Sequence, residues 1–471
     1  MKTIFIRKSL PYTLLLLGVF FMPFNSFNGF EVLGEFKRDS CFLFFFLSGV
    51  LIFFTKKIKF PFYSTLFKVV LLIVFYFFIS GILNVYDMSH YYFKHTSGLN
   101  RFIRQITSLL LSSVFLIYVF YNVLRHYEVN EIFFTLRKVI SYSLLIVALY
   151  GFVEFLIVKG KRTELMPILN LFNYFPFTKA HIDWTTNRMS SVSFESPALA
   201  TYLISIAGWM FSYVLTEKGF KRFIPMFLTI ILSFLSGSRA GIFVIVIQVL
   251  ILVMYLMKDK RFKKLFINIF LISSVLGTLM MLFYSKPIIG YISSKVMSFK
   301  TSDDVHAMSN KTRFGIQTAM FEVFLNNPIK GAGYGLQAFE SSKLYPEWAV
   351  KGNWEFKYKY LNDKHKGFPP GFNLYLRLLS ETGVIGFTFF MFLIVMLLSW
   401  CYKKTFKRQG FQSVIPLMIT ISMVGFAFNW LKMDTFRIYF FWLCLTLIIL
   451  IQRQGTRDER KKNNSFNTPL Q

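Results

Sequence analysis

Long apolar runs alternate with short polar connections along the whole chain. Most of the runs approach the length of about 20 residues that an α-helix needs to cross the hydrocarbon core of a bilayer. The pattern therefore predicts an all-α fold, a polytopic bundle of about twelve transmembrane helices. The expected helices cover residues 10–28, 40–55, 63–85, 106–124, 139–158, 196–216, 223–237, 240–257, 265–285, 373–400, 412–430 and 437–451.

One connection, 286–372, is much longer than the others. A loop of this length is too long to be a passive connector in a compact membrane protein. Apolar residues in 313–325 have helical spacing, and Asn326-Asn327-Pro328 ends that stretch. We therefore divide the chain into helices within 1–285, a large loop containing short helices at 286–372, helices within 373–452, and a polar tail at 453–471 without regular structure.

The basic residues predict how the bundle is oriented. Alternate connections, beginning with the N-terminus, contain 26 Lys and Arg residues, whereas the remaining short connections contain 13. Positive charge is concentrated in cytoplasmic connections. The bias places both termini in the cytoplasm and the connections 86–105, 159–194 and 286–372 on the opposite side.

Composition supports a membrane protein and excludes several other classes. The chain is 55% hydrophobic, which leaves too few polar residues for a soluble surface. The net charge of +30 lies mainly in short connections and includes no nucleic-acid-binding module, so we expect contact with membrane lipid and not with nucleic acid. The six histidines and three cysteines have no ligand spacing, and no nucleotide-binding glycine pattern is present. We expect neither a metal nor a cofactor.

Arg239 is the sharpest candidate for chemistry. It lies in Ser236-Gly237-Ser238-Arg239-Ala240-Gly241, a tight junction between two apolar helices at the outer interface. An arginine there is costly unless it meets a counter-charge or a polar cavity. Its planar guanidinium suits phosphate, and small neighbours would allow an anion to approach the backbone. We take Arg239 as a catalytic candidate, although a side chain that reaches to the interface would look the same in sequence.

The large loop supplies a second group of candidates. Arg313 lies in its first half, and a glycine-rich turn, Lys330-Gly331-Ala332-Gly333-Tyr334-Gly335, follows the predicted helix. Successive backbone N–H groups in such a turn can bind an anion, although a plain flexible turn has the same composition. Arg313 is therefore a catalytic candidate, and Lys330 and Tyr334 are candidates for substrate binding.

Two further segments carry polar residues at the outer ends of helices. Arg188 precedes Glu195, which lies at the mouth of the predicted helix 196–216. A carboxylate there could deprotonate a sugar hydroxyl, pair with Arg239 or cap the helix. After the large loop, Asn373, Arg377 and Glu381 share one helix face. We take Arg188, Asn373 and Arg377 as substrate-binding candidates, while an i,i+4 ion pair between Arg377 and Glu381 is the structural alternative.

Four motifs together resemble the O-antigen polymerase and O-antigen ligase superfamily. They are SGSRAG at 236–241, the arginine early in the large loop, NNPIKGAGYG at 326–335 and GFNLYLRLLSETGVIG at 371–386, and the resemblance spans about residues 190–430. It implies a bacterial inner-membrane enzyme with a large periplasmic loop, acting on glycans linked to undecaprenyl diphosphate without a metal. It also implies that Arg239 and Arg313 hold the diphosphate and that a chain-length regulator protein is a possible partner.

The resemblance leaves the reaction open between three functions. We expect a polymerase that joins lipid-linked repeat units; the alternatives are a ligase that moves glycan to lipid A–core, and a flippase or exporter without chemistry. Members of the superfamily often have His-Asn where the loop meets the next helix, but this chain has Phe372-Asn373. Phenylalanine accepts no proton, so His365 and Glu195 are the substitutes for a base. The missing histidine favours the polymerase.

Overall fold

The computed structural model describes residues 9–55, 58–184, 187–258, 263–264, 267–268, 271, 307–406 and 413–466. Within these residues the protein is an all-α bundle, as the apolar pattern predicts. The described sheet is a single small hairpin of β1 (Tyr92–Phe93) and β2 (Thr96–Ser97), which pair antiparallel. The predicted helix at 265–285 lies almost entirely outside the described residues.

Six helices in the described part of the chain are long and apolar enough to cross a membrane. They are α3 (Thr65–Ile82), α5–η2–α6 (Gly98–Leu110, Leu111–Phe115, Leu116–Leu124), α7 (Val129–Val158), α9–α10 (Ser196–Phe211, Tyr213–Thr216), α12 (Arg239–Leu256) and α17 (Leu374–Phe406). Shorter apolar helices pack among them: α1 (Leu10–Phe20), α2 (Ser40–Thr55), α11 (Ile224–Leu235) and α18 (Val414–Asn429). The last helix, α19 (Tyr439–Phe466), is apolar only over Tyr439–Gly455.

Helix ends differ from the predictions where a local residue or a tertiary partner decides them. The first helix ends at Phe20 and not at residue 28, because Pro23 disfavours helical backbone in the residue before it. Helix α7 begins at Val129, ten residues before the start of the predicted helix 139–158. Arg137 can be buried within it because its guanidinium is 3.0 Å from the Glu217 carboxylate. The tail that we expected to lack regular structure continues α19 to Phe466, since its Lys, Arg and Glu residues favour helix.

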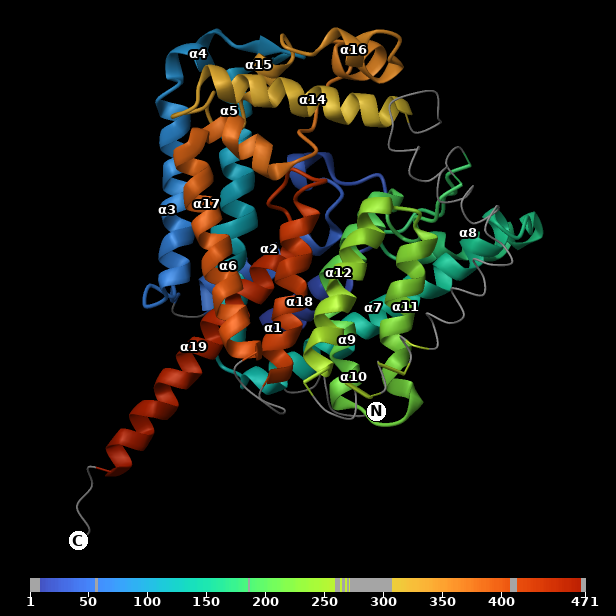
Figure 1. The fold of residues 1–471 in the computed structure, drawn as a ribbon, viewed down its shortest axis with the longest axis vertical. Coiled ribbons are helices and arrows are strands. Elements are labelled where there is room, and N and C mark those ends of the chain that lie inside the picture. Colours follow the sequence, from blue (N-terminus) through green and yellow to red (C-terminus); the bar gives the residue numbers. More distant parts are fainter. Residues whose placement is uncertain are drawn as a thin grey trace.

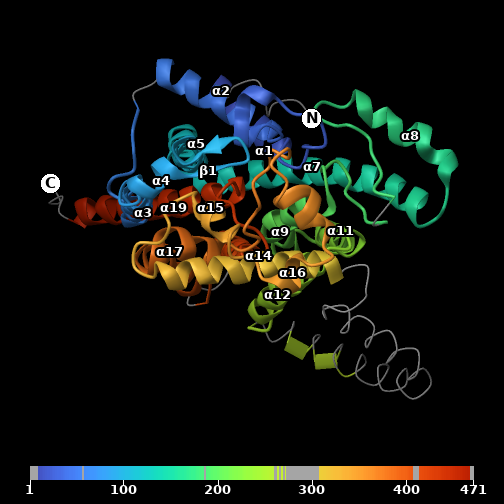
Figure 2. The same cartoon turned by 90° about the horizontal axis from the view of Figure 1, so that it is seen from above.

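The large loop covers one end of the bundle. Its described part contains α14 (Ala307–Asn326), α15 (Gln337–Ser341), α16 (Glu347–Val350) and η6 (Phe356–Tyr360), and α14 ends at the predicted Asn326. Figure 1 shows α14 lying across the top of the vertical helices, beside α15, α16 and the short α4 (Val85–His90), while α10 lies at the opposite end. Figure 2, seen from above, shows α14 next to α16 and over the bundle. We call this the α14 end.

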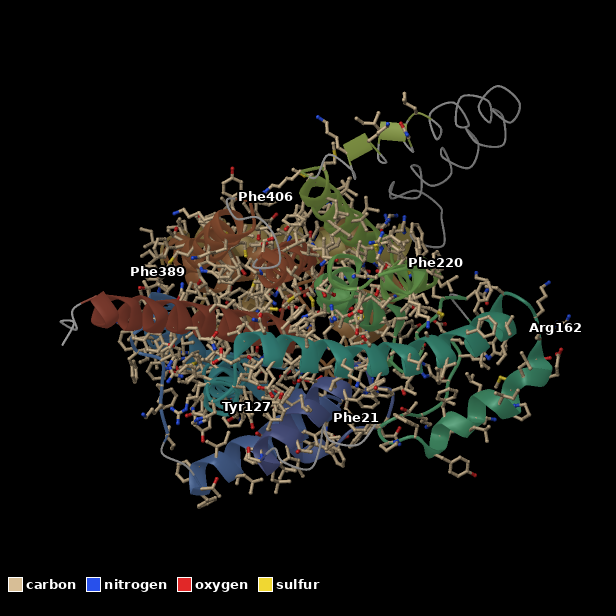
Figure 3. The ribbon with its side chains drawn as sticks, turned by 90° about the horizontal axis from the view of Figure 1, so that it is seen from below. Phe21, Tyr127, Arg162, Phe220, Phe389 and Phe406 are labelled. Atoms are coloured by element: carbon tan, nitrogen blue, oxygen red, sulfur yellow. The ribbon has the colours of Figure 1, made fainter. Side chains whose placement is uncertain are left out.

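A second outgrowth extends sideways from the bundle. After α7, the chain forms η3 (Thr163–Leu165), α8 (Met166–Asn170) and η4 (Leu171–Tyr174), and then returns toward α9. Figure 3, seen from below, shows Arg162 at the margin of the molecule, beyond the C-terminal end of α7. The last short elements are η1 (Glu31–Phe36) between α1 and α2, and η5 (Phe220–Phe223) before α11.

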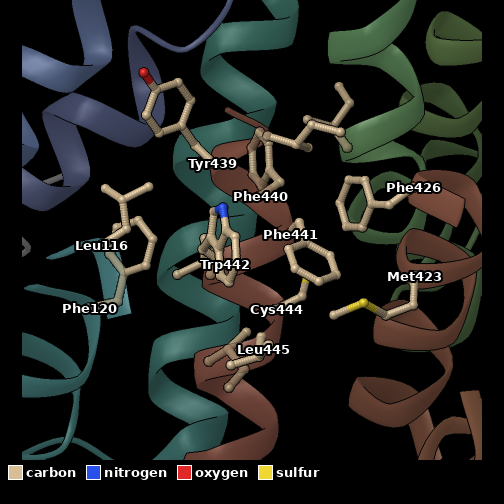
Figure 4. Close-up of a cluster of buried hydrophobic side chains, with 14 of the residues drawn as sticks. Leu116, Phe120, Met423, Phe426, Tyr439, Phe440, Phe441, Trp442, Cys444 and Leu445 are labelled. Carbon is tan, nitrogen blue, oxygen red and sulfur yellow. The ribbon is translucent and has the colours of Figure 1, made fainter. Parts of the chain in front are cut away.

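Aromatic packing between α18, α19 and α6 fixes the centre of the bundle. Figure 4 shows Phe441 and Trp442 of α19 between Phe426 of α18 and Phe120 of α6. The rings of Phe441 and Phe426 are 5.9 Å apart, and all four side chains are buried. Trp430, fully buried at the end of α18, continues this packing toward the α14 end. The connection from α18 to α19 therefore rests on a rigid base.

Candidate functional site

A cavity of about 790 Å³ opens at the α14 end of the bundle. Its walls come from segments that are far apart in the sequence: residues 22–39, the turn at 193–195 with the start of α9, α14, the stretch 355–372 and the connection 432–440. Glu195 and Arg313, both catalytic candidates from the sequence, line this cavity. The fold thus brings together two residues that are more than 100 positions apart.

The carboxylate of Glu195 lies in the cavity among positive charges. Glu195 precedes α9 in an extended conformation, and its side chain is exposed to the cavity. Partial loss of contact with water inside the cavity raises the pKa of Glu195, although surrounding cations oppose this shift. The cations that act on it are Lys359, Arg313, Arg38 and Lys432. A carboxylate with a raised pKa is a suitable proton acceptor for a hydroxyl group.

The turn before Glu195 is fixed by a carboxylate inside the bundle. Glu154, fully buried in α7, accepts hydrogen bonds from the backbone N–H groups of Ser190 at 3.1 Å and Ser191 at 2.7 Å. Nearer to Glu195, the Phe194 N–H donates to the Asn25 side chain at 2.9 Å. These bonds hold the turn rigid, so the carboxylate of Glu195 is placed by the fold and not by a mobile loop.

Arg313 contacts the residue that stands where the superfamily often has histidine. Its guanidinium lies 5.3 Å from the centre of the Phe372 ring, within the range of a cation–π contact. Phe372 has a positive φ of 55°, and it lines the cavity. Of the two substitutes for a base, Glu195 lies in the cavity, whereas His365 is exposed outside it and accepts a bond from the Gly367 N–H.

Arg188 and Arg239 lie together beside this cavity. Arg239 opens α12, whose first turn is capped by Ser238 accepting a bond from the Gly241 N–H at 3.3 Å. The neighbouring Gly237 has a φ of 64°, and a Cβ there would be 3.1 Å from the Arg188 side chain. Burial lowers the pKa of Arg188, and so do the charges of Arg239 and Arg313. The charge of Arg313 therefore influences the pKa of both Arg188 and Glu195, so the pair of Arg188 and Arg239 lies close to the cavity.

The structure does not bring Tyr334 and Arg377 to the cavity. Tyr334 is buried and stacks on Phe77 with ring centres 4.9 Å apart. Arg377 is buried and forms the expected pair with Glu381 at 3.0 Å, and it also donates to the Gln105 side chain at 2.8 Å. With these partners, Arg377 joins α17 to α5 within the protein core.

Asn373 and the glycine-rich turn also have structural partners. The Asn373 side chain accepts hydrogen bonds from the Tyr375 and Leu376 N–H groups, so it caps α17. In the turn, the N–H groups of Ala332 and Gly333 each donate at 2.8 Å to carbonyls of α17. The sequence left open whether these donors face an anion or belong to a plain turn; in the structure, they bind the helix.

The same turn fits α17 closely because both segments contain glycine. Gly331 has a φ of 67°, and a Cβ there would be 2.4 Å from the Glu381 backbone. Gly383 interrupts the helix with a φ of 62°, and a Cβ there would be 2.0 Å from the carbonyl oxygen of Ile329. No side chain fits in either place. Lys330, between these contacts, is half-buried and does not line the cavity.

Several cavity residues were not candidates from the sequence. Glu35 and Asp39 form ion pairs with Arg437, with Glu35 Oε2 at 3.9 Å and Asp39 Oδ2 at 3.5 Å from guanidinium nitrogens, and the Tyr439 hydroxyl donates to Asp39 at 2.8 Å. Arg38, Lys359 and Lys432 were also missed. For the residues in the short connections 29–39 and 431–437, the available signal was their charge, which we used only to predict topology. In the described ranges, no group of three His, Cys, Asp or Glu residues could hold a metal ion.

Lys94 holds the part of the loop that presents Lys359 to the cavity. It is 2% exposed, and its ammonium donates to the backbone carbonyls of Lys359 at 2.5 Å, His365 at 2.9 Å and Asn362 at 3.3 Å. We expect Lys94→Met to destabilise the protein by about 1–3 kcal/mol, because it leaves these carbonyls without their donor. Thermal unfolding in detergent measures this, with exposed Lys366→Met as the control. Equal unfolding temperatures for both variants would contradict the role of Lys94.

Part of the chain that carries these residues matches a known protein family. Residues 224–391 match the profile of a family described as O-Antigen ligase. The matched segment includes Arg239, Arg313, the glycine-rich turn and the first half of α17. No curated protein matches the chain. Over residues 224–391, the match confirms the resemblance to the O-antigen polymerase and ligase superfamily that the four motifs indicated.

Proposed function

We propose that this protein is a polymerase that joins oligosaccharide repeat units carried on undecaprenyl diphosphate, at the periplasmic face of a bacterial inner membrane. The large loop faces the periplasm, and both termini lie in the cytoplasm. The observation that carries the proposal is the cavity at the α14 end, where Glu195 lies among Arg38, Arg313, Lys359 and Lys432. Glu195 offers a proton acceptor there, and the Lys and Arg side chains that line the cavity outnumber the carboxylates.

The reaction follows from these two properties. A hydroxyl of the acceptor unit gives its proton to the Glu195 carboxylate, and its oxygen forms a bond to the anomeric carbon of the donor glycan. The bond between that carbon and the diphosphate oxygen breaks, and the electron pair leaves on the lipid diphosphate. Arg313 and the neighbouring cations stabilise the charge that develops on this leaving group. No redox partner or nucleotide enters the balance.

The ligase reaction uses the same donor and differs in its acceptor. Phe372 favours the polymerase in our view, since the ligase branch relies on the histidine expected there. A deletion strain separates the two functions. Loss of a polymerase leaves lipopolysaccharide with single repeats, whereas loss of a ligase leaves core without any repeat. The polymerase proposal fails if the deletion strain shows bare core.

A flippase or exporter is the candidate from another class. A transport path requires charged residues along the depth of the helices. The charges that line the cavity gather instead at the α14 end, and the buried Arg377–Glu381 pair serves the packing of α17. Lipid-linked units accumulating on the cytoplasmic face of a deletion strain would support the transporter and contradict an enzyme.

Arg239 provides a test of the arginine pair beside the cavity. We expect Arg239→Ala to reduce polymerisation in membranes by about tenfold or more, because a charge-assisted bond to the diphosphate is worth about 1.5–3 kcal/mol. Arg239→Lys should restore part of the rate, since it keeps the charge but not the planar fork. Glycan length and rate are measured at matched protein levels. If both variants make long chains at the normal rate, Arg239 does not bind the donor.

A further inference from the structure

Lys432 has a feature that the proposed reaction does not yet use. Its side-chain nitrogen is buried and has no hydrogen-bond partner in the described part of the chain. The residue lines the cavity together with Arg313 and Glu195. Buried polar groups in folded proteins are almost always paired, so an unpaired buried amine at a cavity wall indicates a missing ligand.

The backbone around Lys432 is held firmly, so the point from which its side chain reaches the cavity is fixed. The Lys432 N–H donates to the Asn429 carbonyl at 3.0 Å, and the buried Trp430 indole donates to the Thr435 carbonyl at 3.0 Å. The next residue, Met433, accepts a bond from the Leu374 N–H at 3.0 Å. These contacts tie the connection between α18 and α19 to the start of α17.

The charges around the amine identify the class of ligand. The pKa of Lys432 is lowered to about 8, chiefly by burial and also by the positive charge of Arg313, while Glu195 opposes both effects. Arg313 and Lys432 therefore line the same cavity, near the carboxylate of Glu195. An anion with several oxygens can accept bonds from both the guanidinium and the ammonium, and phosphate oxygens suit both donors.

We propose that Lys432 is a direct ligand of a phosphate group in the cavity, and that it binds this group jointly with Arg313. In the proposed function, this group is the diphosphate of the lipid-linked donor, and only that identification rests on the proposed function. Lys432 thereby extends the anion site to a residue outside the matched segment 224–391.

Binding of inorganic diphosphate to the purified full-length protein in lipid nanodiscs tests the proposal without requiring any turnover. We expect Lys432→Gln to weaken binding at pH 7 by about tenfold or more, the effect of losing one charge-assisted hydrogen bond. Lys432→Arg should stay within a few-fold of the wild type. Lys351→Gln, at an exposed lysine of the large loop, is the matched control for the loss of one charge. Thermal unfolding shows whether each variant is folded.

The dependence on pH gives a second readout. Wild-type affinity should fall as pH rises through about 8, because the amine loses its proton, whereas Lys432→Arg should keep its affinity. The charged groups acting on this amine are Arg313 from α14 and Glu195 from the turn before α9, and both are unchanged in the Arg variant. The protonation of diphosphate changes with pH in the same way for the wild type and Lys432→Arg. The difference between their affinities therefore reports the protonation of Lys432.

The outcomes separate this inference from the proposed function. Equal affinity in the wild type, Lys432→Gln and Lys351→Gln overturns the role of Lys432, even if the protein polymerises glycan. Diphosphate binding that depends on Lys432 supports the role, even if a deletion strain shows no defect in polymerisation. Equal weakening in Lys432→Gln and Lys351→Gln also overturns it, because the effect would then be general electrostatics.

Discussion

Glu195→Gln should reduce the rate of glycan polymerisation by about 10²–10⁴-fold, the usual contribution of a positioned general base. The amide keeps the size and polarity of the side chain but accepts no proton from the acceptor hydroxyl. The effect should appear in the rate at saturating donor, measured in membranes with matched protein levels. Glu347→Gln, at an exposed residue of α16 outside the cavity, should keep the wild-type rate.

The pH profile identifies the group responsible. The pKa of Glu195 is raised by burial, so its carboxylate should become protonated at a higher pH than an ordinary glutamate. The wild-type rate should therefore fall on acidification, because the protonated form cannot act as a base. That acidic limb should be missing from the residual activity of Glu195→Gln. A variant that retains the limb would assign the base to another group.

Arg313→Ala should reduce polymerisation by about 10²–10³-fold, comparable to the loss of one donor that stabilises developing charge. The guanidinium stands beside Glu195 and Lys432 in the cavity, where the leaving diphosphate gains its charge. Arg313→Lys should recover part of the rate but lose the stacking on Phe372, which suits a planar cation.

Lys311→Ala is the matched control for this prediction. Lys311 lies two residues earlier on α14 and does not line the cavity, so its removal changes the net charge of the helix equally. We expect near wild-type polymerisation from it. If Arg313→Ala and Lys311→Ala reduce the rate by the same factor, the effect comes from the overall charge of α14 and not from a site contact.

The length of the apolar runs predicted most of the bundle. Residues 40–55 and 196–216 begin and end where the structure has them. The prediction failed where a distant partner decides the outcome. Arg137 made residues 129–138 look too polar for a membrane helix, but Glu217, which sequence spacing does not place nearby, pairs with it. Periodicity describes a segment alone and cannot show such a partner.

The candidate site was predictable only in part. Glu195 and Arg313 stood out because each lies beside a recognisable helix end or motif, and both line the cavity. Lys359 and Lys432 lie in stretches without a motif, and only the fold of the large loop over the α18–α19 connection brings them to Glu195. Conversely, Arg377 resembled a binding residue because it is polar and near a motif, yet its partners are in the core.

The glycine-rich turn at 331–335 has a consequence for recognising related proteins. Gly331 is required by the close approach to α17, and two N–H groups of the turn donate to carbonyls of that helix. Selection on the turn therefore preserves architecture and is blind to the sugar that is transferred. A sequence search that begins from this turn should collect proteins with a shared scaffold, whereas sorting them by reaction requires the residues at positions 195, 313, 372 and 432.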